Sequence, residues 1–515
     1  MSKANYAALL KTGRQAGVLL PVASLPGPHG IGDLGRGAYR YLDFAQSAGL
    51  GVWQFLPLGP TAYGDSPYQA LSTFAGNELY IDLENLRELG LLADEELAGL
   101  RALPAAYVDY PQVIALKWKA LLAAAGRFDK CATSNLQAEL DQFCARHDTH
   151  WLHDYALFRV LKAQHRQRPW TEWPQPFIER DPVALKRLEA TAVNELHAIK
   201  VLQFLFNRQW QLLRQYAHDA GVTLFGDMPI YIALDSADAW SRPEMLRLDA
   251  NGRPLAVAGV PPDYFSADGQ LWGNPLYDWQ RHAKSNYGWW INRIRSTLEQ
   301  ADIIRIDHFR GFESYWAVAA DALTARLGQW ETGPGDALFE AVKKELGELP
   351  IVAEDLGIIT PEVEALRDRL ALPGMTVLQF AINDEGFDLA RVAENRVCYT
   401  GTHDNDTTLG WYRGSPGDLR SADDIAATRH KVHVLTSSDG SDVANAMIKA
   451  AFSTKARLAI APLQDYLGLG SEARLNIPGT TANNWRWRVT EAALSDSLSA
   501  QIAGMVDTAG RRPPP

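Results

Sequence analysis

The stretch Asp302–Gly311 places charged residues inside an otherwise strand-like apolar pattern. It reads D-I-I-R-I-D-H-F-R-G, with Arg305 and Asp307 two positions apart. Side chains two apart on a strand share a face, so these two are predicted to lie side by side. Burying a carboxylate and a guanidinium costs several kcal/mol of desolvation. The pair is therefore either a structural ion pair or part of a reactive site.

Acidic residues also end three other apolar runs. Asp227 stands in G-D-M-P, Glu354 in V-A-E-D, and Asp404 in T-H-D-N-D. Any one of them could be a helix cap or a loop acid. Bringing several carboxylates to one rim costs stability unless they share a task. Together with Asp307 they favour a catalytic cluster.

Other uses of such a cluster fit the sequence less well. We find no H-E-x-x-H zinc motif, no G-x-S-x-G nucleophile elbow and no glycine-rich phosphate cradle. Paired carboxylates beside an arginine suit glycosidic-bond chemistry, in which one acts as nucleophile and the other as proton donor. Neither an organic cofactor nor a metal is expected.

Composition narrows the class of partner. The chain has 515 residues and a net charge of −11, which argues against nucleic acid or an anionic membrane surface. Apolar runs are short, so no membrane span is expected. Three cysteines without metal-ligand spacing, and no secretory leader pattern, indicate a cytoplasmic location. The 16 tryptophans are mainly packing residues but also fit a sugar site.

Apolar runs that follow helical patterns are predicted to be the strands that position these acids. By our count there are eight: Gly17–Val22, Gly49–Gly59, Val222–Tyr231, Ile303–Phe309, Ile351–Gly357, Thr376–Ala381, Val397–His403 and Ala456–Ala461. Such alternation of helices with continuously apolar strands predicts an α/β protein with a parallel sheet. Eight units favour a (β/α)8 TIM barrel over a doubly wound open sheet, and no G-x-G-x-x-G follows any strand.

Two connections are too long to be ordinary loops. We assign residues 1–59 and 210–515 to the catalytic barrel and residues 60–209 to a mainly helical inserted subdomain. Residues 232–287 form a second insertion between the third and fourth strands, with the loop Gly259–Phe265 in it. Insertions after barrel strands lie at the C-terminal face, where barrel active sites are found.

Eight motifs can now be taken together: R-I-D-H-F-R-G, V-A-E-D-L-G, T-G-T-H-D-N-D-T, G-D-M-P-I-Y, G-D-S-P-Y-Q, A-G-N-E-L-Y, G-V-P-P-D-Y-F and L-W-G-N-P. With these motifs, the chain resembles the amylomaltase family of 4-α-glucanotransferases (disproportionating enzymes), which are relatives of the α-amylases. The matches run from about Val18 to Trp487. The segment Tyr315–Ala320 lacks the proline expected there, which we interpret as a local packing variation.

The resemblance implies transfer of α-1,4-glucan segments between maltooligosaccharides, or to glucose, by a retaining double displacement. It implies that Asp307 is the nucleophile, Glu354 the general acid/base, and Asp404 the third carboxylate, which binds the 2- and 3-hydroxyls of the −1 sugar. It also implies a set of substrate-binding residues: Tyr68, Asp227, Asp263, Trp272, Arg305, His403 and Asn484.

The residues themselves agree with this mechanism. Arg305 is expected to lower the pKa of Asp307 and keep it ionised. Glu354, near other acids and partly desolvated, is expected to have a raised pKa and to hold a proton at neutral pH. A retaining pair needs its carboxyls about 5–5.5 Å apart, which neighbouring strand ends can supply.

The sequence does not fix the acceptor. The same chemistry with water as acceptor would make an α-amylase-like hydrolase, and a glucan-binding scaffold with an inactive site is a third hypothesis. We expect the Gly259–Phe265 loop, with its paired prolines, to cover the acceptor side and disfavour water. The oligomeric state, monomer or dimer, stays open.

Overall fold

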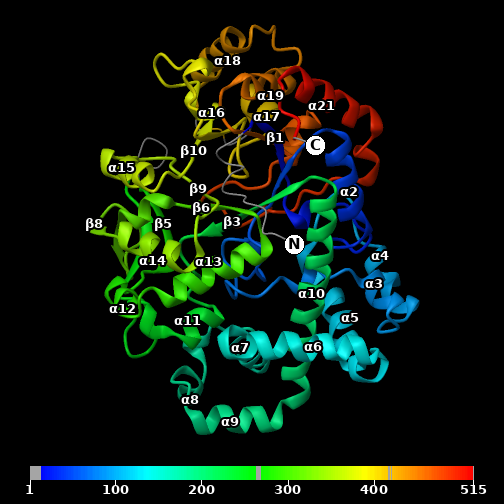
Figure 1. Ribbon diagram of the computed structural model, residues 1–515. Coiled ribbons are helices and arrows are strands. Elements are labelled where there is room, and N and C mark those ends of the chain that lie inside the picture. The colour runs from blue at the N-terminus through cyan, green and yellow to red at the C-terminus, as the bar shows by residue number, and fades with distance from the viewer. Residues whose placement is uncertain (1–12, 263–267, 416–417, 419, 514–515) are drawn as a thin grey trace.

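The computed structural model has at its core a barrel of eight parallel strands (Figure 1). It describes residues 13–262, 268–415, 418 and 420–513. The strands are β1 (Gln15–Leu19), β2 (Val52–Gln54), β3 (Thr223–Pro229), β6 (Ile303–Asp307), β9 (Ile351–Ala353), β10 (Gly374–Val377), β11 (Arg396–Tyr399) and β12 (Leu458–Pro462). They follow one another around the barrel in sequence order, and β12 pairs with β1. Between β9 and β10 the backbone N–H of Ala353 donates to the carbonyl of Pro373 (2.8 Å). The predicted TIM barrel is confirmed.

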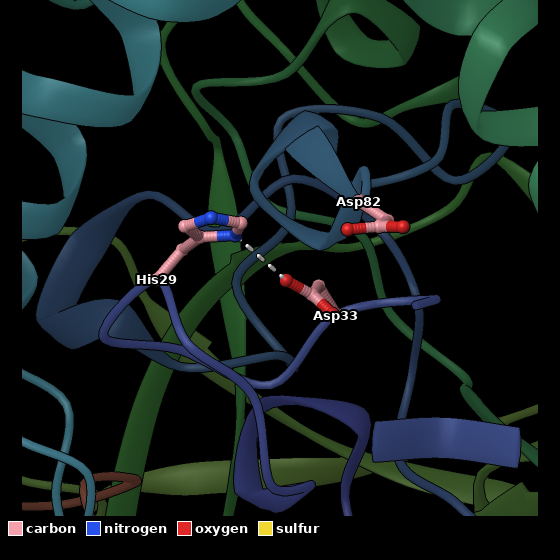
Figure 2. A group of neighbouring side chains, drawn as sticks. All are labelled: His29, Asp33 and Asp82. Carbon is pink, nitrogen blue, oxygen red and sulfur yellow. Dashed lines mark hydrogen bonds and ion pairs between the residues drawn. The ribbon is translucent and has the colours of Figure 1, made fainter. Parts of the chain in front are cut away.

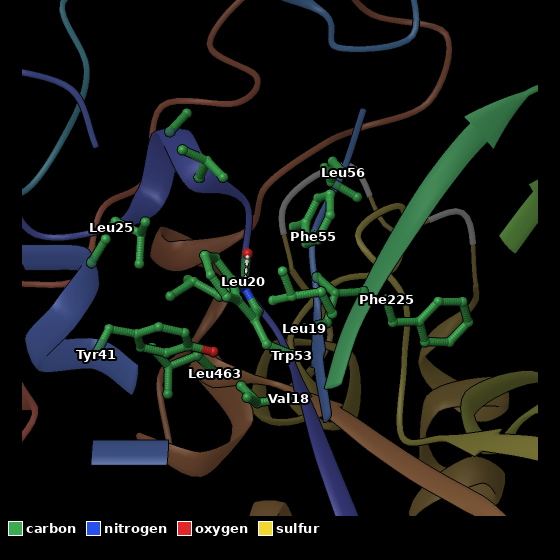
Figure 3. Close-up of a cluster of buried hydrophobic side chains, with 14 of the residues drawn as sticks. Val18, Leu19, Leu20, Leu25, Tyr41, Trp53, Phe55, Leu56, Phe225 and Leu463 are labelled. Atoms are coloured by element: carbon green, nitrogen blue, oxygen red, sulfur yellow. Dashed lines mark hydrogen bonds between the residues drawn. The ribbon is translucent and has the colours of Figure 1, made fainter. Parts of the chain in front are cut away.

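Alternating side chains of the strands build two layers of core. In β6, Ile303 belongs to the cluster that contains side chains of the other barrel strands, while Ile304 and Ile306 pack beneath helices α13 (Gly288–Gln300) and α14 (Asp336–Leu346). Figure 3 shows another part of the core, where Trp53 of β2 lies beside Phe55 and its indole N–H donates to the carbonyl of Leu20 (2.8 Å). Because these residues are buried on both sides, the strands read as continuously apolar.

One predicted strand is partly wrong. The run predicted as Thr376–Ala381 is strand only to Val377, and Leu378–Ala381 forms the short helix α16. The buried Gln379 at this turn donates from its side chain to the carbonyl of Asp406 (3.0 Å). A short apolar run does not distinguish a strand from a buried helical turn, which is why the sequence pattern missed the change.

The long connection after β2 is mainly helical. Its principal helices are α5 (Tyr110–Cys131), α6 (Ser134–His147), α7 (His153–Gln164), α9 (Pro182–Thr191) and α10 (Val193–Asp219), and they gather along one side of the barrel (Figure 1). Helix α10 runs through residue 209 without a break and leads directly into β3. Its Trp210 packs edge-on against Phe55, with ring centroids 5.1 Å apart.

A second, four-stranded antiparallel sheet lies beside the barrel. Its order is β5 (Gln270–Pro275), β4 (Ala256–Val260), β7 (Ser314–Ala319) and β8 (Gly328–Thr332). The second insertion therefore pairs with a hairpin that follows β6, an arrangement the sequence patterns did not indicate. The segment without the expected proline forms β7. Of the predicted loop Gly259–Phe265, residues 263–265 lie outside the described residues.

Candidate active site

The predicted acids lie at the C-terminal ends of the barrel strands. Asp227 lies near the end of β3 and Asp307 ends β6, while Glu354 directly follows β9 and Asp404 lies in the loop after β11. Arg305 joins two of them: its guanidinium donates to Oδ1 of Asp307 (2.9 Å) and to Oδ2 of Asp227 (3.0 Å). The side-by-side placement predicted for Arg305 and Asp307 is thus present.

Tyr68 connects this group to the far wall of the barrel mouth. Its hydroxyl donates to Oδ2 of Asp227 (2.7 Å) and accepts from Arg305 (3.2 Å). Its ring stacks on His403, with centroids 5.1 Å apart and planes 20° apart. The Oδ1 atom of Asp227 is buried and has no hydrogen-bond partner within the described part of the chain. An unpaired buried acceptor of this kind suits a ligand hydroxyl.

The carboxylate of Glu354 is fixed by backbone groups of two loops. The N–H of His308 donates to Oε2 (2.7 Å) and the N–H of Leu356 donates to Oε1 (2.8 Å). His308 directly follows Asp307, so its N–H holds Glu354 against the end of the neighbouring strand. The backbone of His308 is left-handed there, with φ of 54°. Burial, and next the charge of Asp307, raise the pKa of Glu354 to about 8, as the sequence led us to expect.

The prediction of a lowered pKa for Asp307 is wrong. Arg305 does act in that direction, but burial outweighs it and Asp227 adds a second raising effect, so the pKa of Asp307 rises to about 6. Sequence spacing identified the arginine but not the depth of burial around the carboxylate. At neutral pH Asp307 is still mainly ionised while Glu354 is mainly protonated.

At Asp404 the effects that lower the pKa outweigh the effect of burial. Burial raises its pKa, but His403 and a hydrogen bond from Asn476 hold the pKa of Asp404 well below its ordinary value. Its Oδ2 lies 3.3 Å from Nε2 of His403, and its side chain is 48% exposed. Asp404 is therefore an ionised carboxylate with room for a ligand beside it.

The remaining predicted binding residues lie in three different situations. Trp272 on β5 packs edge-to-face against His308, with centroids 4.7 Å apart, so its indole borders the Glu354 side of the site. Asn484 is buried and holds a turn: its Oδ1 accepts from the N–H of Ile477 (3.1 Å), and its Nδ2 donates to the carbonyl of Thr480 (2.9 Å). Asp263 lies outside the described residues.

Two residues at the site escaped the sequence analysis. His308 stands within the R-I-D-H-F-R-G motif, so its position beside Asp307 was an available indication. Asn476 donates from its amide to Oδ1 of Asp404 (2.6 Å) across 72 residues of sequence. No local pattern could have pointed to that contact.

One cluster elsewhere has the spacing of a metal site. His29, Asp33 and Asp82 bring ligand atoms within 4.8 Å of one another (Figure 2), the one such group within the described ranges. The fully buried ammonium of Lys117 lies 3.7 Å from Asp33. Both oxygens of Asp82 cap helix α3 (Leu83–Glu88) through the N–H groups of its first turn. We call these four residues the Lys117 cluster; its own ammonium supplies the positive charge that a metal would bring.

Comparison with known proteins decides the family. A family profile described as 4-alpha-glucanotransferase matches residues 20–494. The chain belongs to this family. The 4-alpha-glucanotransferase of Thermus thermophilus is 45% identical over 504 residues, covering 97% of this chain and 99% of the relative. That of Synechocystis sp. is 45% identical over 507 residues, covering 97% and 98%.

Solved structures agree with this assignment. Amylomaltase from Streptococcus agalactiae, in complex with acarbose, has a TM-score of 0.91 at 34% identity and covers 97% of this chain and 100% of its own. Amylomaltase from Corynebacterium glutamicum has a TM-score of 0.81, covering 99% and 77%; at 20% identity that likeness concerns the fold.

This 4-α-glucanotransferase is a transglycosylating enzyme of the amylomaltase type, so the hydrolase and the inactive scaffold are not favoured. Its relatives include enzymes named from plant chloroplasts and amyloplasts as well as from bacteria. Among the helices that the structure describes, none is both long enough and apolar enough to cross a membrane.

Proposed function

We propose that Asp307, Glu354 and Asp404 perform a retaining double displacement on α-1,4-glucans. The observation that supports this best is the hydrogen bond from the N–H of His308 to Glu354, because His308 directly follows Asp307 in the chain. A half-buried pair of neighbouring carboxyls, one mainly ionised and one mainly protonated at neutral pH, suits this chemistry.

In the first step the ionised Asp307 attacks the anomeric carbon of the −1 sugar. Glu354 gives its proton to the glycosidic oxygen as the bond to it breaks, and the released glucan end departs with a 4-hydroxyl. The −1 sugar is then held as a glycosyl ester of Asp307. The pKa values of about 6 and about 8 allow both groups to be in the required form near pH 7.

In the second step Glu354, now a carboxylate, takes the proton from the 4-hydroxyl of an incoming sugar. The hydroxyl oxygen bonds to the anomeric carbon, the ester breaks, and Asp307 returns to its ionised form. Two displacements at the same carbon retain its configuration. The proton of Glu354 is restored, so the enzyme is ready for another cycle.

The other site residues are proposed to bind the sugar chain. Asp227 offers its unpaired Oδ1 to a hydroxyl, while Tyr68 and His403 form the wall beside it. Trp272 offers an indole beside His308 for contact with a sugar ring. We keep Asp263 and Asn484 as binding residues from the family resemblance, with Asn484 acting through the turn it holds. The Streptococcus agalactiae relative forms a complex with acarbose, which supports sugar binding by this chain as well.

Maltooligosaccharides are the proposed donors, with glucose or another maltooligosaccharide as acceptor, and we propose that the enzyme works in the cytoplasm. Free rather than disulfide-bonded cysteines support that location: Cys131, Cys144 and Cys398 are all unpaired.

Incubation with maltotriose tests the proposal. Separation of products by chain length should show glucose together with glucans longer than the substrate. The variants Asp307→Asn and Glu354→Gln should each lose at least about 10³-fold in turnover, because each removes a group that makes or breaks a bond. Asp368→Asn changes an exposed acid on a helix and serves as the control. Products that are only shorter than maltotriose, or an active Asp307→Asn variant, would contradict it.

A further inference from the structure

The side chain of Asp404 is held from two sides. Its Oδ2 faces Nε2 of His403 at 3.3 Å, and its Oδ1 accepts from Nδ2 of Asn476 at 2.6 Å. His403 is the preceding residue, so it moves with the same loop. Asn476 is the partner that reaches Asp404 from another part of the chain, the segment that follows β12.

Arg474 fixes the backbones of both partners. Its guanidinium donates to the carbonyl of Asp404 (2.9 Å) and to the carbonyl of Asn476 (2.7 Å). The two residues therefore keep their relative position even where their side chains border open space. A hydrogen bond between groups fixed in this way costs little conformational entropy to form.

The turn after Asn476 is fixed as well. Asn484 accepts from the N–H of Ile477 (3.1 Å), and the N–H of Trp485 donates to the carbonyl of Leu475 (2.6 Å). Leu475 and Trp485 are buried, so they anchor the two ends of the turn in the core. The amide of Asn476 thus projects from a rigid frame toward Asp404.

A neutral amide has a specific advantage at this place. It donates a charge-assisted hydrogen bond, which favours the ionised carboxylate and fixes its plane. It adds no positive charge, so the full negative charge of Asp404 remains available to a sugar ring that becomes positive in the transition state. Each carboxylate oxygen also keeps a free lone pair for a sugar hydroxyl.

We propose that Asn476 is a positioning residue for glucan transfer. It sets the plane of the Asp404 carboxylate and keeps it ionised, so that Asp404 can bind the −1 sugar. This rests on the proposed role of Asp404. The other charged or titratable groups that act on Asp404 are His403 and Arg305, with Asp307 and Tyr68 across the site and Arg474 at the backbone.

Two variants of matched size separate positioning from bulk. Asn476→Leu removes the donor, and Asn476→Asp replaces it with an acceptor that repels Asp404. We expect kcat on maltotriose to fall about 10- to 100-fold, more in Asn476→Asp, while KM changes less than about threefold, because the lost bond matters most in the transition state. The acid limb of the kcat/KM profile should stay in place in Asn476→Leu, because that limb follows Asp307, and the pKa of Asp404 lies far below it.

Thr481→Ala, an exposed change in the same turn, is the matched control and should keep the wild-type profile. The thermal melting temperature of each variant reports on folding. Unchanged kcat in both Asn476 variants would overturn the proposal, as would a fall in kcat matched by an equal rise in KM, or a loss of rate explained by unfolding alone. Asp404→Asn is measured beside them: if it stays active, the role of Asp404 itself fails, which is a different result.

Discussion

Burial and neighbouring charge give Glu354 and Asp307 different pKa values, and therefore different protonation states at neutral pH. Burial raises the pKa of each, and the charge of Asp307 raises that of Glu354 further. Arg305 opposes the rise at Asp307 more closely than at Glu354, since it contacts the Asp307 carboxylate directly. The difference in pKa between the two groups, which the mechanism uses, therefore comes from the charge of Asp307 acting on Glu354 and from the guanidinium beside Asp307.

This arrangement predicts a bell-shaped pH dependence of kcat/KM. Activity should fall as the pH drops through about 6, because Asp307 becomes protonated, and fall again as the pH rises through about 8, because Glu354 loses its proton. The two limbs belong to the coupled pair rather than to separate residues. Initial rates on maltotriose across the pH range measure both limbs.

The variant Arg305→Gln tests the cause of the acid limb. With the lowering effect of the guanidinium removed, the limb should move to higher pH, and turnover near neutral pH should fall about tenfold or more. Arg369→Gln, an exposed arginine on a helix, is the control. An acid limb that stays in place in Arg305→Gln would contradict the assignment of that limb to Asp307.

At the scale of elements, the Lys117 cluster joins helix α5 to the loop that follows β1. The ammonium of Lys117 is fully buried, and its nearest acid, Asp33, is fully buried too. Removing one partner of a buried ion pair leaves a charge without compensation. The packing of the helical insertion on the barrel thus depends on a charge carried by the helix.

The substitution Lys117→Met keeps the aliphatic part of the side chain and removes the charge. We expect unfolding to become easier by about 3–5 kcal/mol, as for other broken buried pairs. Chemical denaturation followed by tryptophan fluorescence measures this. Lys119→Met, two residues along the same helix and exposed, should change little. Equal stability of the two variants, or a wild-type melting temperature that a chelator lowers, would contradict the assignment.

The sequence predicted those elements whose pattern reflects their own surroundings. Strand β6 was found because Ile303, Ile304 and Ile306 are buried on both faces. Elements that depend on distant partners were missed: β8 pairs Trp330 with Trp316, and α16 replaces the end of a predicted strand. The acids of the site could also be predicted, because each stands in a local motif at the end of an apolar run.

The supports of that site were not visible. The contact of Asn476 with Asp404 crosses 72 residues of sequence. The net pKa of Asp307 depends on burial by the assembled barrel, which spacing along one strand cannot report.

At the scale of the whole molecule, the end of the chain seals the junction between the first and last barrel strands. Helix α21 (Asp496–Thr508) packs on α2 (Arg36–Ser47), which brings Arg511 to the base of β1 and β12. The N–H of Ala16 donates to the carbonyl of Arg511 (3.1 Å). The buried guanidinium donates to backbone carbonyls on both sides of the junction: Gln15, Phe452, Thr454 and Ala456.

The substitution Arg511→Met should therefore weaken the closure of the barrel. It leaves several buried carbonyls without a donor, each at a cost of about 1–3 kcal/mol, although the methionine keeps part of the packing. Because the junction joins the two ends of an eight-stranded ring, opening there exposes strand edges over its whole height. We expect faster irreversible heat inactivation with kcat and KM unchanged before heating, since the active site lies at the opposite end of the strands.

Arg512→Met removes only an exposed pair with Asp507 and should inactivate at the wild-type rate. Matching inactivation rates in the two variants would show that the barrel stays closed without Arg511.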